Sequence, residues 1–288
     1  MSEEADPPIS ILPSALAETQ GDRPFVAIVR SRQELCRWLS NPLPGLRWLQ
    51  VEGMLGDAEA WTEAAHSNCN IPLDVVVSDP ASEFSHLYRL VDACAVRAIR
   101  VTMPAAPGLA KAIRLAAALR LPVRVLPGQP SAAALQELHD ALQFYLHEAT
   151  VEAPVEFFHS VLATMCDSDA GSLWTILEED PDVFRHYDAD GRARMPRTSD
   201  PDRSEITSAG FVKDHLSRLI TQGAECATCP WQQPCRGYFK WPDPAYSCEG
   251  VKQLFSSIQT AGNEIRQDVA SFAEADKGIS SEPREATR

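Results

Sequence analysis

The chain has 288 residues, of which 44% are hydrophobic, so it is long enough for one large or two ordinary domains with a substantial core. Its formal net charge is −14 and no local basic patch offsets it, which argues against a general affinity for nucleic acid or anionic membranes. The first residues lack a basic segment followed by an apolar one, and no apolar run has the length of a membrane span, so we expect a cytoplasmic protein.

Residues 1–24 are polar and acidic with scattered prolines, and we expect a disordered leader there. From residue 25, short apolar runs rich in β-branched side chains alternate with segments of helical spacing. Asp57, Ser82 and Ser131 are placed to cap three of the helices. The alternation predicts an α/β fold with a parallel sheet, as an open or partial barrel or as a doubly wound sheet. The expected strands are residues 25–29, 46–53, 73–77, 98–103 and 122–126, and the expected helices are residues 33–39, 58–66, 82–94, 108–120 and 131–147.

Beyond residue 150 the chain connects this scaffold to a cysteine-rich region. Residues 157–165 fit a strand or a short helix, and residues 173–184 fit an amphipathic turn and helix. Residues 211–220 and 251–273 have helical spacing, and the second of these helices is expected to pack back on the scaffold or on the cysteine-rich module. Residues 274–288 are polar and are expected to form a disordered tail.

Four of the eight cysteines fall within 23 residues, at Cys226, Cys229, Cys235 and Cys248. Cys226 and Cys229 form a C-x2-C pair, whose turn can direct two thiolates at one metal centre. The segment between the four cysteines contains four prolines and has no helix or strand period, which indicates a stiff loop. We therefore expect all four residues to be metal ligands.

Four thiolates suit a tetrahedral zinc ion or a [4Fe-4S] cluster, and spacing alone does not separate the two. The interleaved aromatic side chains are expected to form a dry shell, which favours a cluster because it shields the sulfur atoms. A disulfide framework is the weaker interpretation, since disulfides belong to oxidising compartments and small secreted domains. The aromatic residues are Trp231, Tyr238, Phe239, Trp241 and Tyr246.

The region from residue 183 to residue 269 resembles the SPASM domain, a cysteine-rich extension of many radical S-adenosylmethionine (radical SAM) enzymes that modify peptides. The family pattern is a hairpin segment C…G-x4-C, then C-x2-C-x5-C-x3-C, then an isolated Cys, and it normally binds two auxiliary [4Fe-4S] clusters. Cys226, Cys229 and Cys235 match the C-x2-C-x5-C run, and Cys248 matches the isolated Cys. The resemblance implies that these four residues bind one [4Fe-4S] cluster.

The chain departs from the family pattern at the ligands of the other cluster. Phe239 stands where the family has the Cys that follows x3. Residues 186–197 resemble the family hairpin, with an Asp190-Gly191 turn, but Arg197 stands about where a Cys would follow. In the family, these positions serve the second cluster, so we expect one cluster and not two.

The resemblance also implies a partial (β/α)6 TIM-like barrel before the module, which we place at residues 25–182, with the module at residues 183–273. In the family, a C-x3-C-x2-C motif in the loop after the first strand holds the initiating cluster. Residues 30–39, which we expect to be that loop, contain only Cys36, and the motif occurs nowhere in the chain. Residues 51–54 contain at best a remnant of the family's Gly-Gly-Glu segment. Without three thiolates no iron with an open site can bind and cleave the cofactor, so independent radical initiation is not expected.

Three functions follow as hypotheses. The favoured one is a non-catalytic iron-sulfur accessory protein that binds one [4Fe-4S] cluster and assists a partner radical SAM enzyme in modifying a ribosomally made peptide. The second is a radical peptide maturase whose initiator cluster is supplied in trans, and the third is a structural zinc-binding interaction module. We assign no catalytic residue, and we expect the other four cysteines to be structural. These are Cys36, Cys69, Cys94 and Cys166.

Overall fold

The computed structural model describes residues 7–165, 171–198 and 209–279 of the chain. Its centre is a nine-stranded sheet in the order β7-β6-β5-β4-β3-β2-β1-β8-β9. Neighbouring strands pair in parallel, except that β8 and β9 form an antiparallel hairpin. The strands are β1 (Ile9–Pro13), β2 (Phe25–Val29), β3 (Leu46–Glu52), β4 (Leu73–Val76), β5 (Ile99–Pro104), β6 (Val123–Leu126), β7 (Val155–Glu156), β8 (Phe184–Tyr187) and β9 (Ala193–Arg194).

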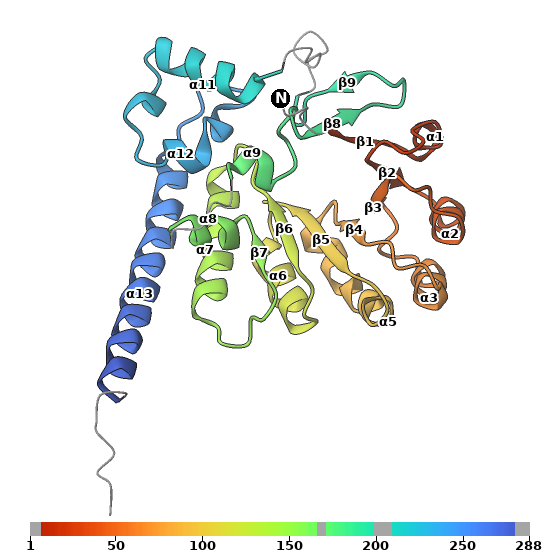
Figure 1. Cartoon of the computed structure of the whole chain (residues 1–288), viewed down its shortest axis with the longest axis horizontal. Coiled ribbons are helices and arrows are strands. Elements are labelled where there is room, and N and C mark those ends of the chain that lie inside the picture. Colours follow the sequence, from red (N-terminus) through yellow and green to blue (C-terminus); the bar gives the residue numbers. More distant parts are fainter. Residues whose placement is uncertain (1–6, 166–170, 199–208, 280–288) are drawn as a thin grey trace, which may run out of the picture.

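Strands β1 to β7 are neighbours in the order in which they follow in the chain, so each crossover returns on the same side of the sheet. The sheet curves into an open arc and the crossover helices lie on its outer side (Figure 1). The doubly wound alternative is therefore wrong, because that arrangement requires the strand order to reverse. The crossover helices are α1 (Ser14–Ala17), α2 (Arg32–Ser40), α3 (Ala58–His66), α4 (Pro80–Glu83), the 3₁₀ segment η1 (Phe84–Leu90), α5 (Val91–Cys94), α6 (Leu109–Ala118) and α7 (Ala132–His147).

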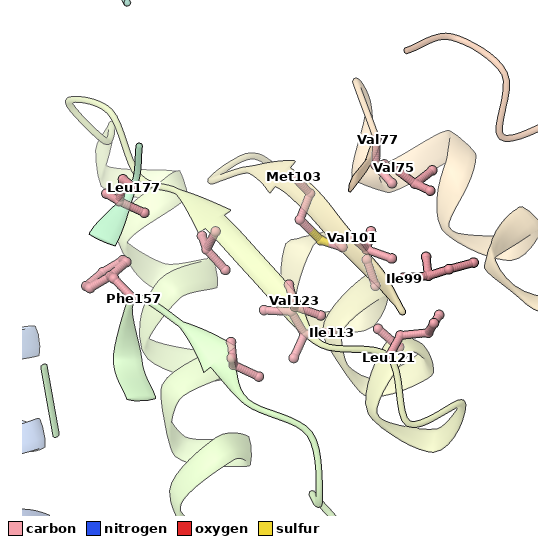
Figure 2. Close-up of a cluster of buried hydrophobic side chains, with 14 of the residues drawn as sticks. Val75, Val77, Ile99, Val101, Met103, Ile113, Leu121, Val123, Phe157 and Leu177 are labelled. Atoms are coloured by element: carbon pink, nitrogen blue, oxygen red, sulfur yellow. The ribbon is translucent and has the colours of Figure 1, made fainter. Parts of the chain in front are cut away.

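The core lies between the outer face of the sheet and these helices. Val75, Val101 and Val123 are at most 1% exposed and face the helical layer, where Ile113 of α6 lies beside Val123 (Figure 2). Because side chains alternate along a strand, the residues between them point to the inner face of the arc. That inner face is polar at its centre, where Asp74, Thr102 and Arg124 are buried. The β-branched side chains thus pack against the helices on the outer face, and the polar side chains occupy the concave inner face.

The expected disordered leader at residues 1–24 is wrong for residues 9–17. Ile9–Pro13 forms β1, which pairs with β2 on one side and with β8 on the other, and Ser14–Ala17 forms α1. The run is short and follows two prolines, so it carries little local strand signal, yet Ile11 and Leu12 are at most 2% exposed. Tertiary pairing with two strands stabilises it. Residues 1–6 lie outside the described part of the chain.

Two other expectations also need correction. The crossover from β4 to β5 starts at Asp79, whose carboxylate accepts hydrogen bonds from the Ala81 amide and the Ser82 hydroxyl, so Ser82 is not its cap. Asp57 and Ser131 do cap their helices as predicted. The final helix α13 (Glu249–Ile279) continues into the predicted disordered tail at residues 274–288, and residues 280–288 are not described.

After β7 the chain forms the elements that carry the cysteine-rich region. It passes through the predicted hairpin, turning at Gly191 with φ +77°, and then forms a compact group of short helices at the start of α13 (Figure 1). None of the described helices is long and apolar enough to span a membrane. The elements are α8 (Phe158–Met165), α9 (Leu173–Ile176), α11 (Phe211–Thr221), the 3₁₀ segments η2 (Glu225–Thr228) and η3 (Tyr238–Lys240), and α12 (Gln232–Cys235).

Candidate metal centre

The four predicted ligands come together. Cys226, Cys229, Cys235 and Cys248 line one cavity, and none of them is in a disulfide. The cavity has about 20 Å³ of space for a water-sized molecule. Within residues 7–165, 171–198 and 209–279, no three Cys, His, Asp or Glu side chains are grouped as they would be around a single ion.

The C-x2-C turn is built by η2. Cys226 lies inside this 3₁₀ segment and Cys229 ends it, with the Cys229 amide donating to the Cys226 carbonyl at 3.4 Å. The Gln232 side chain donates to the same carbonyl at 2.9 Å, which fixes the turn to α12. Two of the predicted ligands are thereby held on one short, closed segment.

Cys235 lies at the end of α12, where the backbone adopts a left-handed conformation at two successive residues. Arg236 has φ +45° and Gly237 has φ +76°, and the turn directs the amides of Gly237, Tyr238 and Phe239 toward the Cys235 sulfur. Burial raises the pKa of this thiol to about 11, and the hydrogen bonds from these amides oppose that effect. Consecutive amides around one anion form a nest of the kind found at many iron-sulfur sites. The backbone amides therefore offset part of the cost of a negative charge at this buried sulfur.

Glu225 connects the first of the four cysteines to the last. It precedes Cys226 in the chain, and its carboxylate accepts a hydrogen bond of 3.2 Å from the Cys248 amide. The same carboxylate pairs with Lys240 at 2.8 Å and with Lys252. Partial burial raises the pKa of Glu225, but these bonds outweigh burial and lower it to about 2. Glu225 is thus a stable anion that holds the start of α13 against η2.

Lys240 brings a buried positive charge to the cavity. It is 6% exposed, and its ammonium also donates to the Tyr246 carbonyl. Burial and the Glu225 charge raise the pKa of Cys248 to about 12, whereas Lys240 acts in the opposite direction. Burial likewise raises the pKa of Cys226, and Lys240 again lowers it. These lysine effects are what a site for thiolates requires, because thiolates bind metals and thiols do not.

The expected aromatic shell is correct in part. Trp231 and Phe239 line the cavity, and both pack against Phe255 of α13, at ring-centroid distances of 5.6 and 6.2 Å. Tyr238 and Trp241 instead contact Trp174 and Phe211 on the other side of the module. Tyr246 donates to the Pro130 carbonyl at 2.8 Å and so joins the module to the loop between β6 and α7. The sequence interpretation missed Phe255, which its helical spacing from Cys248 could have indicated.

Arg197 and Phe239 stand where the family pattern has ligands of a second cluster, and both make other contacts here. Arg197 pairs with Glu179 at 2.7 Å and donates to the Trp241 carbonyl at 3.0 Å. Its guanidinium carbon lies 4.0 Å from the centre of the Tyr238 ring and 5.4 Å from that of Trp174. Phe239 is 1% exposed and forms part of the wall around the four cysteines. A cation among aromatic rings and a buried phenyl group thus stand where the family pattern has cysteines.

The region where the family carries its initiating cluster contains only one cysteine in this chain, Cys36. Helix α1 follows β1 at once, and only Arg30 and Ser31 separate β2 from α2. Cys36 lies in α2, where its thiol donates to Glu63 on α3, so it is a helix residue and not a loop ligand. Glu52, in the remnant at residues 51–54, pairs with Arg30 at 2.8 Å. Cys69 and Cys94 pack against the core as expected, and Cys166 lies outside the described residues.

A buried network of charges occupies the inner face of the sheet, which the sequence interpretation did not anticipate. Asp74 pairs with Arg124 at 2.6 Å and with Arg100 at 2.7 Å, and it accepts a hydrogen bond of 2.6 Å from Thr102. Both arginines also pair with Glu178. Burial raises the pKa of Asp74, but the two arginines and the hydrogen bonds hold it below its ordinary value. The chain's own ion pairs therefore satisfy the charges at the centre of the arc.

Comparisons with known proteins support the type of fold. A solved structure of anSMEcpe with bound AdoMet and Cp18Cys peptide matches with a TM-score of 0.53 at 11% identity, covering 90% of this chain and 100% of that chain. A structure of anSMEcpe with bound AdoMet alone matches with a TM-score of 0.52 at 10% identity and the same coverage. No family model and no curated protein matches. The similarity shows that this chain shares the fold of those structures, and the fold seen here is a mostly parallel α/β sheet.

Proposed function

We propose that this chain is an iron-sulfur accessory protein that binds one [4Fe-4S] cluster through Cys226, Cys229, Cys235 and Cys248. It assists a partner radical SAM enzyme in modifying a peptide, and it does not initiate radicals itself. The observation that carries the proposal is the convergence of four free thiols on one cavity with the amide nest at Cys235. A bound cluster with four cysteine ligands has no open coordination position, so it supplies electron transfer or structural support.

The chain's residues provide what such a group requires. Trp231, Phe239 and Phe255 exclude water from one side, and the amides after Cys235 donate toward its sulfur. The C-x2-C turn and the hydrogen bond from the Cys248 amide to Glu225 bring ligands from three elements together. Arg197 and Phe239 stand in place of the second set of ligands, which supports one cluster and not two.

The accessory role is supported by the absence of an initiator motif from a fold of this type. No C-x3-C-x2-C occurs in the 288 residues, and the loop between β2 and α2 consists of only Arg30 and Ser31. The fold neighbour binds AdoMet and a peptide, and we carry the peptide to this chain as part of the proposal while assigning AdoMet cleavage to the partner. Electrons or a docked peptide would pass between the two proteins.

The test is the content of iron, sulfide and zinc, with a visible spectrum, of protein purified without oxygen. We expect about four irons with matching sulfide and a brown band that bleaches with reductant. Cys229→Ala should lose the iron, whereas Cys94→Ala, at a half-buried thiol on the far scaffold, should keep it. One zinc that persists after anaerobic reconstitution would replace this proposal with the zinc module. Formation of 5′-deoxyadenosine by the isolated protein would contradict the accessory role.

A further inference from the structure

Three charged residues form one group beside the four thiols. Glu225, Lys240 and Lys252 line the same cavity as the cysteines, and Glu225 pairs with both lysines. The two ammonium groups differ in environment, because the side chain of Lys240 is 7% exposed and that of Lys252 is 35% exposed. We call these three residues the lysine clamp. No part of the family resemblance requires them.

The clamp carries one net positive charge, since it joins two ammonium groups and one carboxylate. A buried ammonium is costly unless it has partners, and Lys240 has two, Glu225 and the Tyr246 carbonyl. Lys240 and the four cysteines line the same cavity, and the Lys240 side chain is only 7% exposed. Its charge therefore lies beside the sulfur atoms, where little water screens it.

We propose that the lysine clamp raises the reduction potential of the four-cysteine site, with Lys240 contributing more than Lys252. This inference rests on the proposed function. A cluster with four thiolates has a net charge of about −2, and one-electron reduction adds one more negative charge without a proton. A nearby cation stabilises the reduced state more than the oxidised state. The effect is larger where water is excluded, because Coulomb energies increase as the effective dielectric constant falls.

Glu225 has the opposite sign within the same group. Its carboxylate offsets one of the lysines, and it also accepts from the Cys248 amide. Loss of its charge with retention of an acceptor, in Glu225→Gln, should make the site easier to reduce. A general loosening of the site would move every variant in one direction, whereas an electrostatic role predicts opposite directions for lysine and glutamate variants.

The experiment is an anaerobic redox titration of the reconstituted full chain with dithionite, monitored by the visible band and by electron paramagnetic resonance. Iron and sulfide are counted in each sample first. We expect Lys240→Met to shift the one-electron equilibrium at least tenfold toward the oxidised form, which corresponds to about 59 mV. Lys252→Met should shift it in the same direction by less, and Glu225→Gln should shift it toward the reduced form. Lys111→Met is the control, because Lys111 packs over Phe84 on the outer scaffold.

Each result decides the matter. Equal potentials for wild type and Lys240→Met, with iron and sulfide retained, would overturn the inference and leave the proposed function intact. A Lys252→Met shift as large as that of Lys240→Met would also overturn it. Wild-type protein without iron and sulfide would overturn both. If Lys240→Met alone loses iron, Lys240→Arg keeps the charge and Glu225→Gln still tests the sign; a wild-type potential in the first and a raised one in the second support the clamp.

Discussion

Glu179 and Arg197 form a buried ion pair of 2.7 Å that joins the segment after α9 to the end of the hairpin. The side chains are 6% and 14% exposed, and Arg197 also donates to the carbonyls of Tyr238 and Trp241. Arg197 therefore connects three segments of the module: the hairpin, the residues after α9 and the loop around η3. Arg197 stands about where the family pattern has a cysteine. At this position the chain therefore has an ion pair that links segments of the module.

Arg197→Met should destabilise the protein by about 3–5 kcal/mol, because it leaves the buried Glu179 carboxyl without its ion-pair partner. The measurement is the free energy of unfolding in denaturant, together with iron content. We expect the double variant Glu179→Gln/Arg197→Met to be more stable than Arg197→Met alone, since it removes the unpaired charge. Four irons should remain in both. Loss of iron from both variants would mean that Arg197 supports the four-cysteine site directly.

Much of the sheet could be predicted because its signal is local. The outer faces of β2 to β6 carry continuous buried apolar side chains, such as Val75 and Val101, and the expected boundaries are correct within about one residue. Strand β1 was missed because its burial depends on β8, which lies far along the chain. The start of the crossover from β4 to β5 was missed although Asp79 before Pro80 is a strong start signal.

The candidate site divides in the same way. The four cysteines could be named from spacing and resemblance, since both are properties of one short segment. The partners that tune them could not, because they meet through tertiary structure. Glu225 reaches Lys252 across 27 residues, and the Asp74 network joins strands 50 residues apart. Pairing of charges over such separations leaves no periodic signal in a single sequence.

Asp74 makes the fold sensitive to acid. Its folded pKa lies below the ordinary value, because Arg124 and Arg100 outweigh burial. A carboxylate with a lowered folded pKa adds stability at pH above its unfolded value of about 4, and this stability is lost as the pH falls through the folded pKa. Glu179 has the opposite sign, since burial raises its pKa, so the total pH dependence mixes the two.

The comparison of wild type with Asp74→Asn isolates this contribution. At pH 7 we expect the variant to be less stable by about 3–5 kcal/mol, because Arg100 and Arg124 then share only Glu178. The difference should shrink as the pH is lowered below about 4, where Asp74 of the unfolded wild type is protonated. The measurement is urea unfolding from pH 7 to pH 3. A difference that stays constant over this range would show that Asp74 acts through packing and not through its charge.

Removal of one predicted ligand should remove the stability that metal binding adds to the module. Cys229→Ala is expected to lower the melting temperature of the reconstituted protein, because binding energy in such sites contributes to folding. The apo forms of wild type and variant should melt at similar temperatures, since the Cys229 side chain is only half-buried. Calorimetry of both forms measures this. Equal melting of the two reconstituted proteins, with full metal content, would show that Cys229 is not a ligand.

The amide nest at Cys235 depends on Gly237. Its φ is +76°, and a Cβ there would lie 2.8 Å from Cδ1 of the buried Leu219 and 3.3 Å from His215. Gly237→Ala should therefore turn the amides away from the Cys235 sulfur and weaken iron retention. Gly223→Ala is the matched control, because Gly223 has φ +74° with no atom within 4 Å of the added Cβ.

Both alanine variants should lose about 1–2 kcal/mol of stability through the left-handed backbone, and only Gly237→Ala should lose more. The measurements are urea unfolding of the apo proteins and the rate of iron release to a chelator from the reconstituted ones. Faster release from Gly237→Ala than from Gly223→Ala would support the nest as part of the site. Equal release rates would mean that the amides after Cys235 only shape the turn, because three lost hydrogen bonds to a ligand sulfur must weaken its hold on iron.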